Sequence, residues 1–474
     1  LIGRAQEPDG YFNTYFILKE PGQRFRNLRE GHELYTLGHM IEAAVAYKRA
    51  TGEKRFLEIV QKMADLVANT FGVEEGKRMG MPGHQEIELA LMKLYEETGK
   101  ESYKELAKYF IDVRGCGNRN YFLEEMKQKD VKRIFPELND YRPEYSQSHL
   151  PVRKQRTAEG HAVRAVYMYA AMADIAAEYD DEELLGACET LWNNMVHRRM
   201  YVTGGIGSSG ILERFTADYD LPNDYNYCES CASIGLAFFA RRMMQITKKA
   251  KYVEVMERAL YNTVLAGIAM DGKSFFYVNP LEVWPPSCME RTSKEHVKSV
   301  RQKWFGVACC PANISRTLAS LGEYIYACEK DTIYVNLFIG NETQITVGEQ
   351  KVHLSLETDF PWKNQFKINV SGVKESVQLA VRIPEYAQDY KIFCEGREQF
   401  YKEKDGYAYI TCEKNGRYEV QFVSEPRFVR ANPKVRADEG KVCVMWGPLV
   451  YTVEETDNGE NLQALYIDTA KPVK

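Results

Sequence analysis

The hydrophobic pattern of the chain changes once, near residue 331, and this change constrains the fold more than any other feature. Before it, apolar residues recur at i, i+3, i+4 and i+7, the period of a helix buried on one face. The pattern predicts about nine helices, for example in "KRFLEIVQKMADLVANTFG" and "HQEIELALMKLYEETG". Short turns that contain glycine separate most of them, which favours antiparallel pairs. Their irregular spacing favours a closed barrel of paired helices over a regular superhelical array.

After residue 331, short segments alternate apolar and polar residues and end at Gly, Asn, Asp or Pro, as in "KVHLSLETD" and "VQLAVRIP". This pattern predicts an all-β sandwich. We therefore expect an α+β multidomain protein, with a helical domain over residues 1–330 and a β-sandwich region over residues 331–474. The last stretch, "VCVMWGPLVYTVEE", predicts one or two more strands. We expect the sandwich region to be cut short there.

Length and charge limit the classes of partner. The 474 residues are 45% hydrophobic, which is ample for a large core and for two or more domains. The formal net charge is -5 and basic residues form no run, so we expect no nucleic-acid partner. The longest apolar runs fall short of the roughly 20 residues that span a bilayer, so we expect no membrane partner. The 31 tyrosines hint weakly at sugar binding, because sugar-binding clefts use aromatic rings as stacking faces.

The chain begins at Leu1, and its opening "LIGRAQEPDGYFNTYF" reads as the continuation of a longer sequence. We therefore expect a fragment, in which a signal peptide can be neither assigned nor excluded. Eleven cysteines, an odd number spread over a large chain, argue against a disulfide framework. Reduced thiols favour a cytoplasmic location. The sequence leaves a homodimer open.

Two clusters of metal-ligating side chains stand before predicted helices. The segment "YNYCESCASIG" carries Cys228, Glu229 and Cys231, and "ACCPAN" carries Cys309 and Cys310. Thiolates with one carboxylate suit a tetrahedral Zn²⁺ ion. Glu229, Cys231, Cys309 and Cys310 would complete such a site. A four-thiolate site that includes Cys228 remains an alternative, as do a set of buried free thiols and a disulfide between Cys309 and Cys310.

Three histidines share one sequence context. His32, His84 and His161 each follow a glycine and each stand at the start of an amphipathic segment. In a barrel of helical hairpins, alternate helices start at the same rim, so the three side chains would meet at one mouth. The positive end of a helix disfavours imidazolium, so we expect neutral, hydrogen-bonding rings. The alternative is that each histidine only caps its own helix.

Several stretches together resemble glycoside hydrolase family 127, whose members include retaining β-L-arabinofuranosidases. Along the chain, the matching stretches are "EGHELYTLGHMIEAAVA", "GHQEIELAL", "EGHAVRAVYMY", "TGGIGSSGILERFTADYDLPND", "YCESCAS" and "ACCPANISR", and they follow one another in the order that the family shows. The resemblance implies an (α/α)6 barrel followed by β-sandwich domains, a bound zinc ion and a cysteine nucleophile. Such a barrel has twelve helices, so we expect its first helices to lie outside this chain.

The resemblance also implies roles for individual residues. Cys309 corresponds to the nucleophile and Glu213, in "ILERF", to the acid/base. Cys228 has no counterpart in the family motif, so an exchange of ligands with it stays open. The implied zinc ligands are Glu229, Cys231, Cys309 and Cys310, and the implied sugar contacts are His32, His84, His161 and Tyr277.

The implied activity is the retaining exo-hydrolysis of terminal β-L-arabinofuranosides on an arabinose-containing oligosaccharide or glycoconjugate. Glu213 would protonate the departing oxygen and later deprotonate water. Zinc would keep Cys309 deprotonated and stabilise it again as the leaving group of the second step. Two alternatives remain: a glycosidase or epimerase of another sugar on the same barrel, and a glycan-binding protein with a purely structural zinc.

Overall fold

The structure is a computed structural model that describes residues 1–473. These residues divide into two compact units. The first unit comprises Leu1–Arg199 and Gly207–Asp218, and the second comprises Met200–Ile206 and the residues from Tyr219 onward. The division falls inside the stretch expected to be helical, so both units contain helices.

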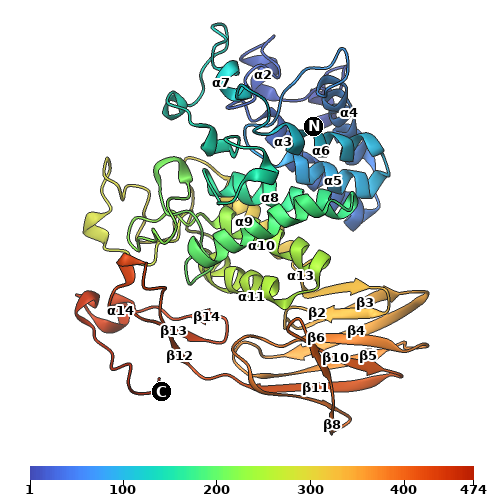
Figure 1. Ribbon diagram of the computed structural model, residues 1–474, viewed down its shortest axis with the longest axis vertical. Helices are drawn as coiled ribbons and strands as arrows, with labels where there is room; N and C mark the ends of the chain where they lie inside the picture. The colour runs from blue at the N-terminus through green and yellow to red at the C-terminus, as the bar shows by residue number, and fades with distance from the viewer. Residues whose placement is uncertain (474) are drawn as a thin grey trace. The chain divides into compact units, whose positions relative to one another are not determined.

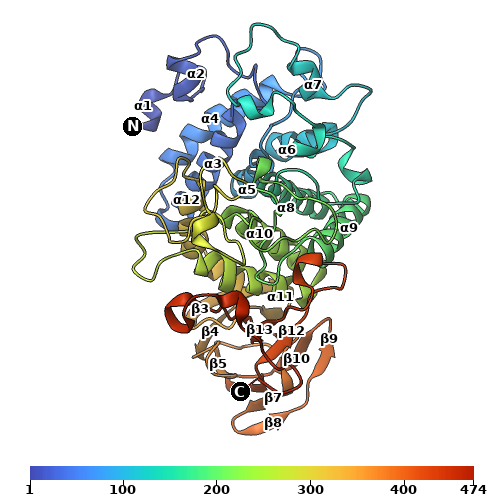
Figure 2. The same cartoon turned by 90° about the vertical axis from the view of Figure 1, so that its left-hand side faces the viewer.

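The first unit is helical. Its helix α3 packs against α4 and α5, and α5 packs in turn against α6 and α8 (Figure 2). Gly52 and Gly99 end α3 and α5 with positive φ angles of 78° and 69°, a conformation that glycine adopts at little cost. The helices are α1 (Ile2–Ala5), α2 (Thr14–Leu18), α3 (Glu33–Thr51), α4 (Arg55–Thr70), α5 (Ile87–Thr98), α6 (Glu101–Val113), α7 (Tyr121–Glu125), α8 (Ala162–Glu178) and α9 (Glu182–Arg198), with 3₁₀ turns at Pro136–Leu138, Pro143–Ser146, Val152–Lys154 and Ile211–Glu213.

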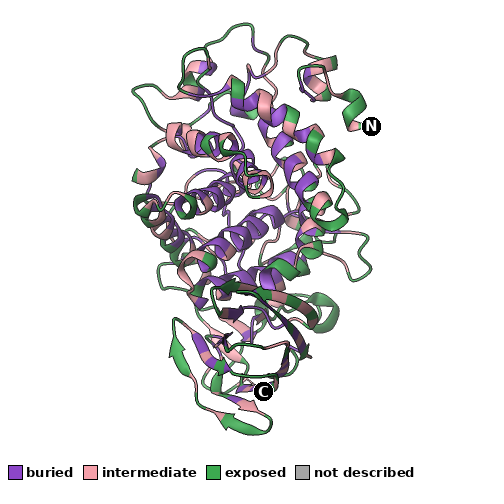
Figure 3. Ribbon diagram, turned by 90° about the vertical axis from the view of Figure 1, so that its right-hand side faces the viewer, coloured by how far each residue is buried: buried purple, intermediate pink, exposed green. Residues whose placement is uncertain are grey.

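Two helices form the interiors of their units. Helix α8 in the first unit and α10 in the second are buried along nearly their whole length, as the purple ribbons of Figure 3 show for the core helices. A helix that is apolar all round is one that its neighbours cover on every side. Most of the candidate functional side chains described below stand at or near the N-termini of these two helices and of other helices in the two units.

The second unit begins with helices and continues into strands. Helix α10 packs against both α11 and α12. Helix α11 runs directly into a π-helical turn at Leu260–Val264. The helices are α10 (Ser230–Thr247), α11 (Ala250–Ala259), α12 (Cys309–Ala319), α13 (Gly322–Ile325) and α14 (Glu455–Asn458), with 3₁₀ turns at Pro285–Ser287, Arg436–Asp438 and Leu462–Ala464.

The strands form three sheets (Figure 1). The five-stranded sheet has the order β1-β2-β6-β10-β9, in which only β2 and β6 are parallel. The six-stranded sheet is antiparallel, with the order β3-β4-β5-β11-β7-β8, and the third is β12-β13-β14. The strands are β1 (Tyr326–Glu329), β2 (Thr332–Val335), β3 (Asn341–Val347), β4 (Gln350–Thr358), β5 (Gln365–Ser371), β6 (Val377–Arg382), β7 (Gln388–Cys394), β8 (Arg397–Gln399), β9 (Lys402–Lys404), β10 (Tyr407–Cys412), β11 (Gly416–Val423), β12 (Arg427–Val429), β13 (Cys443–Trp446) and β14 (Leu449–Val450).

The two larger sheets share one apolar core and so form a β-sandwich. Val335, Leu379 and Ile410 of the five-stranded sheet belong to the same buried cluster as Leu354 and Val420 of the six-stranded sheet. Alternate residues along β4 point into this core, which is the period-2 burial that its sequence predicted.

The predicted succession of a helical region and a β-sheet region is confirmed. Among residues 1–473, nine helices are ten residues or longer, and each coincides with a predicted helical segment. The last of these predictions extended too far: α12 ends at Ala319, and Tyr326–Glu329 pairs as strand β1 with β2. Strand β7 was missed because Ile392 is its only fully buried residue, so its sequence lacks a clear alternation. No helix within the described residues is long and apolar enough to cross a membrane.

Candidate active site

Three sulfur atoms and one carboxylate meet where two helices of the second unit begin. Glu229 is the N-cap of α10 and Cys231 its second residue, while Cys309 and Cys310 are the first two residues of α12. One ligand atom from each of the four residues lies within 4.8 Å of the other three. Because α10 and α12 pack against each other, their N-termini bring together residues about 80 positions apart.

The distances in this cluster fit a small cation. Sγ of Cys231 lies 3.4 Å from Sγ of Cys310, and Oε1 of Glu229 lies 3.3 Å from Sγ of Cys309 and 3.6 Å from Sγ of Cys310. A carboxylate this close to ionisable sulfurs requires a proton or a cation between them. Ligand–metal distances of about 2.0–2.3 Å give a tetrahedron with edges of roughly 3.3–3.8 Å. The donor set and its spacing therefore fit a tetrahedral metal ion.

Cys309 is the thiol that most readily loses its proton. Hydrogen bonds from Cys231 and Cys310 hold the pKa of Cys309 well below its usual range, and the hydroxyl of Tyr277 adds another, 2.8 Å from Sγ. Burial raises the pKa values of Cys231 and Cys310 well above the ordinary value. The N-terminus of α12 also favours a negative charge at this position. The cluster thus concentrates thiolate character on Cys309, which is only half-buried.

Tyr277 is held beside the sulfurs by its main chain. Its carbonyl oxygen accepts a hydrogen bond from the backbone N–H of Ser230, at 3.0 Å, and Val278 pairs with Glu229 as an isolated antiparallel bridge. The ring packs edge-on against Tyr227 and is tilted against Phe305, with centroids 6.2 Å and 5.6 Å away. The backbone that carries Glu229 therefore also positions Tyr277.

Cys228 lies outside the four-ligand cluster. Its Sγ contacts the side-chain amide of Asn226 at 3.1 Å, and burial raises its pKa to about 12. A Cβ atom on Gly205 would lie only 2.8 Å from this sulfur, so the close approach requires glycine there. The ligand atoms that lie within 4.8 Å of one another belong to Glu229, Cys231, Cys309 and Cys310, without Cys228. The alternative four-thiolate site is therefore not the arrangement that the structure adopts.

The structure brings His32, His84 and His161 together within the first unit. The imidazole centroids of His32 and His84 are 5.8 Å apart, and those of His84 and His161 are 5.4 Å apart. His32 and His161 are the N-caps of α3 and α8, and His84 lies two residues before Glu86, the N-cap of α5. We refer to these three side chains as the histidine row.

The glycine before each histidine has a steric reason. A Cβ atom on Gly83 would lie 2.3 Å from the carbonyl oxygen of Arg29, and one on Gly160 would lie 2.0 Å from that of Glu144. Gly160 also has a positive φ of 70°. The repeated Gly-His pattern therefore marks places where a helix entry passes directly against another stretch of backbone.

The hydrogen-bond partners fix how two of the rings are protonated. Nδ1 of His32 lies 2.7 Å from the carbonyl oxygen of Glu30, and Nδ1 of His84 lies 2.8 Å from that of Gln85. Because a carbonyl oxygen can only accept, each Nδ1 carries the proton and each Nε2 is an acceptor. Burial, followed by the charge of Arg164, lowers the pKa of His32 to about 4 and also lowers that of His84. Both rings are therefore neutral acceptors near pH 7.

Glu213 contacts the other end of the histidine row. Its Oε2 lies 2.5 Å from Nε2 of His161, whose Nδ1 accepts a long, 3.5 Å hydrogen bond from the backbone N–H of Arg164. His161 therefore donates through Nε2 to the carboxylate. Leu212 and Glu213 both have positive φ angles, 59° and 54°, in a tight turn closed by hydrogen bonds between Ser209 and Arg214. Strained non-glycine turns of this kind persist mostly at functional sites.

Several neighbours of the histidine row were not predicted. The ring of Tyr35 lies 4.4 Å from that of His84 and 5.4 Å from that of His32, and Phe135 lies 5.6 Å from His32. The buried guanidinium of Arg164 donates to the carbonyl oxygen of Gly83 and lies 4.5 Å from the Tyr145 ring. Tyr35 and Arg164 each stand three residues after a histidine, one helical turn away. That spacing is the one signal that could have indicated them.

Three family models match consecutive parts of the chain. The family model for the catalytic domain of family 127 β-L-arabinofuranosidases matches residues 1–323. The model for the middle domain of the same proteins matches residues 332–424, and that for the C-terminal domain of glycoside hydrolase family 127 matches residues 426–474.

Individual relatives match over similar lengths. A non-reducing end β-L-arabinofuranosidase of Bifidobacterium longum subsp. longum is 42% identical, over 98% of this chain and 71% of that protein. A crystal structure of a family 127 β-L-arabinofuranosidase from Geobacillus stearothermophilus T6 is 49% identical, with a TM-score of 0.93 over 97% of this chain and 73% of that one. A family 127 β-arabinofuranosidase is 38% identical, with a TM-score of 0.83 over 95% and 70% of the two chains.

Proposed function

This chain belongs to glycoside hydrolase family 127, and from that membership we propose that it is an exo-acting, retaining β-L-arabinofuranosidase. Its substrates are terminal β-L-arabinofuranosides in arabinose-containing oligosaccharides or glycoconjugates. Two relatives at 42% and 49% identity are named as enzymes of this specificity. The observation that carries the proposal is the Glu229–Cys231–Cys309–Cys310 cluster, which provides a reactive thiolate together with a set of metal ligands.

The metal of this cluster is zinc in our proposal. Three thiols and one carboxylate at this spacing suit Zn²⁺ better than the harder Mg²⁺ or Ca²⁺, which prefer oxygen ligands. Glu229, Cys231, Cys309 and Cys310 would hold the ion. When bound, zinc supplies a positive charge that keeps Cys309 deprotonated as nucleophile and stabilises the same thiolate as leaving group.

The first chemical step forms a bond between Sγ of Cys309 and the anomeric carbon. The bond from that carbon to the leaving oxygen breaks, and Glu213 gives its carboxyl proton to this oxygen. In the second step Glu213 takes a proton from water, the water oxygen attacks the anomeric carbon, and the carbon–sulfur bond breaks to return the thiolate. Two inversions at one carbon give retention of configuration.

The remaining residues bind the sugar. His32 and His84 offer Nε2 acceptors that suit sugar hydroxyl donors. His161 donates to Glu213 and orients its carboxylate. The hydroxyl of Tyr277 donates to the Cys309 thiolate and fixes the direction from which the sulfur attacks. The arrangement supports roles for all four residues in holding the substrate or the groups that react with it.

We make three wider proposals, on the domains, the location and the oligomeric state. The nine long helices contribute to an (α/α)6 barrel, which is the catalytic domain over residues 1–330, and residues 331–474 form the sandwich region. None of the eleven cysteines forms a disulfide, which supports a cytoplasmic location. A homodimer is the oligomeric state to test first, by light scattering.

A panel of p-nitrophenyl glycosides tests the function. We expect release of nitrophenol from the β-L-arabinofuranoside, with much slower release from the α-L-arabinofuranoside and from pyranosides. Cys309→Ser should abolish turnover while sugar binding persists. Activity on another sugar alone would overturn the assignment, and binding without any turnover would indicate a glycan-binding protein instead.

A further inference from the structure

The histidine row has two different ends. At one end His161 contacts Glu213, and at the other end His32 packs edge-on against the ring of Phe135. His84 and His161 are buried, with 9% and 5% of their surface exposed, whereas His32 and Phe135 are half-buried. An acid/base that protonates the leaving oxygen marks the side of the glycosidic bond. Glu213 therefore places the glycosidic bond beside His161, whereas Phe135 contacts the row at His32.

Phe135 is carried by a segment that lacks regular secondary structure. Met126–Phe135 connects α7 to the 3₁₀ turn at Pro136–Leu138. Side chains from another part of the chain hold the backbone of this segment and of the 3₁₀ turn that follows it. Nδ2 of Asn27 donates to the carbonyl oxygen of Lys132 at 3.0 Å, and Nη1 of Arg29 donates to that of Leu138 at 2.7 Å. The segment's own Arg133 donates to the carbonyl oxygen of Met126 at 2.5 Å.

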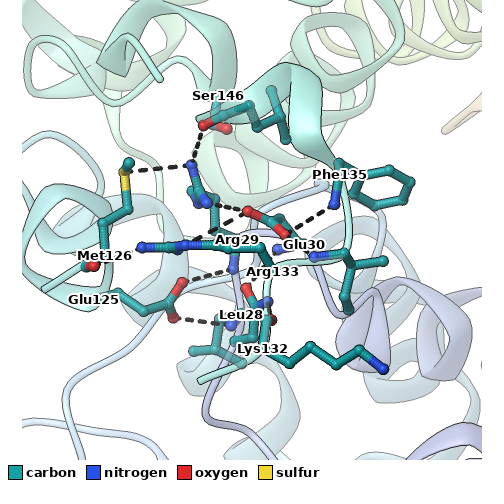
Figure 4. A network of polar contacts seen from close by, with 12 residues as sticks. Leu28, Arg29, Glu30, Glu125, Met126, Lys132, Arg133, Phe135 and Ser146 are labelled. Carbon is teal, nitrogen blue, oxygen red and sulfur yellow. Dashed lines mark hydrogen bonds and ion pairs between the residues drawn. The ribbon is translucent and has the colours of Figure 1, made fainter. Parts of the chain in front are cut away.

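The carboxylate of Glu30 sits at the centre of these contacts (Figure 4). Its Oε2 accepts hydrogen bonds from the backbone N–H groups of Ile134, at 2.6 Å, and Phe135, at 3.1 Å. Its Oε1 pairs with the buried guanidinium of Arg29 and lies 4.0 Å from Nη1 of Arg133. Glu30 is 1% exposed, and bonds from charged groups in such surroundings are stronger than neutral ones.

Glu30 also acts on the histidine row through its main chain. Its carbonyl oxygen accepts a hydrogen bond from the Nδ1–H of His32, and its carboxylate accepts one from the backbone N–H of Phe135. One residue therefore positions both the imidazole and the aromatic ring that packs on it. The two functions are separable, because a change of the Glu30 side chain leaves its carbonyl oxygen in place.

We propose that Phe135 is a specificity-determining residue, a wall that closes the far end of the sugar pocket, and that Glu30 is the residue that positions it. The inference rests on the proposed function and deepens it. A phenyl ring offers no hydrogen bond to a hydroxyl and no room for a substituent. It accepts the unsubstituted end of an arabinofuranosyl group and rejects one that carries a further group. This wall restricts hydrolysis to terminal residues.

Substituted substrates test the proposal. The probes are p-nitrophenyl β-L-arabinofuranoside and its 2-O-, 3-O- and 5-O-methyl ethers, and the quantity is kcat/KM for each ether divided by that for the parent. Phe135→Ala should raise this ratio by about tenfold or more for at least one ether, because one methylene-sized group in an apolar pocket is worth about that much. Phe135→Leu, which keeps much of the bulk, should raise it less.

Lys129→Ala is the matched control, since Lys129 is an exposed residue of the same segment. It should leave all three ratios unchanged. Ratios for Phe135→Ala that stay within about twofold of the wild type for every ether would overturn the proposal. A wild-type protein that fails to hydrolyse the parent glycoside would contradict the proposed function itself, and this inference with it.

The role of Glu30 is tested by a double-mutant cycle. Glu30→Gln should shift the same ratio in the same direction as Phe135→Ala, and the two changes together should exceed the larger single effect by less than about twofold. Full additivity would show that Glu30 does not act through Phe135. If Glu30→Gln unfolds the protein, Arg133→Met offers a second test of how the Phe135 segment is held. This change removes the hydrogen bond from Arg133 to the carbonyl oxygen of Met126, and the Arg133 side chain is only half-buried.

Discussion

His161 is connected to Glu213 by a side-chain contact and to the next residue, Arg214, by backbone pairing. Nε2 of the imidazole lies 2.5 Å from Oε2 of the carboxylate, and the backbone of His161 pairs with Arg214, the residue after Glu213. The backbone N–H of Phe215 also donates to the carbonyl oxygen of Gly160, at 2.9 Å. The turn that carries Glu213 is therefore bound to the entry of α8 by main chain and side chain together, which fixes the position of the carboxylate that we propose transfers the proton.

The proposed acid/base role of Glu213 predicts that the effect of its substitution depends on the leaving group. Glu213→Gln should slow the glycosylation step by about 10²–10³-fold for sugars with unactivated leaving groups, which need the proton, and by less than about tenfold for p-nitrophenol. Azide should rescue the second step of the variant and give a β-configured arabinofuranosyl azide. Single-turnover kinetics measure both effects.

Glu182→Gln, at an exposed position near the start of α9, is the control for this experiment and should behave as the wild type. Unchanged activity of Glu213→Gln on a disaccharide would assign the acid/base to a different carboxyl group.

The sulfur cluster predicts which cysteines retain the metal. Cys231→Ala and Cys310→Ala each remove one of four ligands, so the purified variants should contain far less than one zinc per chain. Cys228→Ala should keep its zinc, since this sulfur contacts Asn226 rather than the cluster. Elemental analysis of protein purified under reducing conditions measures the difference. Loss of zinc from Cys228→Ala but not from Cys231→Ala would contradict the ligand assignment.

The raised pKa of the buried Glu125 carboxyl group predicts that the folded protein becomes less stable as the pH rises. Burial raises its pKa to about 7, although Glu125 accepts hydrogen bonds from the backbone N–H groups of Leu28 and Arg29. Between about pH 4.5 and pH 7 the folded protein keeps a proton that the unfolded chain has released. The free energy of unfolding should therefore decrease across this range, by about 1–3 kcal/mol for this group.

Chemical denaturation between pH 5 and pH 8 measures this slope. Glu125→Gln should make the slope shallower, whereas Glu105→Gln, on the exposed face of α6, should not change it. A slope that is the same in all three proteins would show that Glu125 does not carry the proton.

The ion pairs between β6 and α11 predict that replacing Arg382 strongly destabilises the folded protein. The fully buried Arg382 donates to Oε1 of Glu254 at 2.7 Å and to the carbonyl oxygen of Asn336 at 2.7 Å, and it also pairs with Glu257. Arg382→Met would leave the buried Glu257 and the largely buried Glu254 without their counter-charge and should cost about 3–5 kcal/mol. Arg397→Met in the exposed strand β8 should cost less than about 0.5 kcal/mol. Urea unfolding followed by circular dichroism compares the two, and equal losses would contradict the role of Arg382.

The sequence predicted the elements whose signals are local. Each long helix follows its own apolar period, and the cysteines of the sulfur cluster stand out because thiols at two helix entries are rare. Glu213 gave no local signal: its position depends on a strained turn and on pairing with the entry of α8, more than 50 residues earlier. Only the resemblance to a family singled it out.

Long-range contacts explain the rest of what was missed. Glu30 and Phe135 are 105 residues apart in the sequence, and neither lies in a periodic pattern. A buried carboxylate that binds two backbone N–H groups of a distant segment can be recognised only when that segment is in place. Strand β1 was read as the end of a helix because its partner, β2, and not its own sequence, determines its conformation.

The stereochemistry of methanolysis tests the central claim most directly. The protein would be mixed with p-nitrophenyl β-L-arabinofuranoside in aqueous methanol, and the first methyl glycoside formed would be assigned by proton nuclear magnetic resonance. A cysteine nucleophile with Glu213 as acid/base predicts methyl β-L-arabinofuranoside, formed by the wild type and not by Cys309→Ser. Methyl α-L-arabinofuranoside as the first product, or an unchanged rate for Cys309→Ser, would contradict the account.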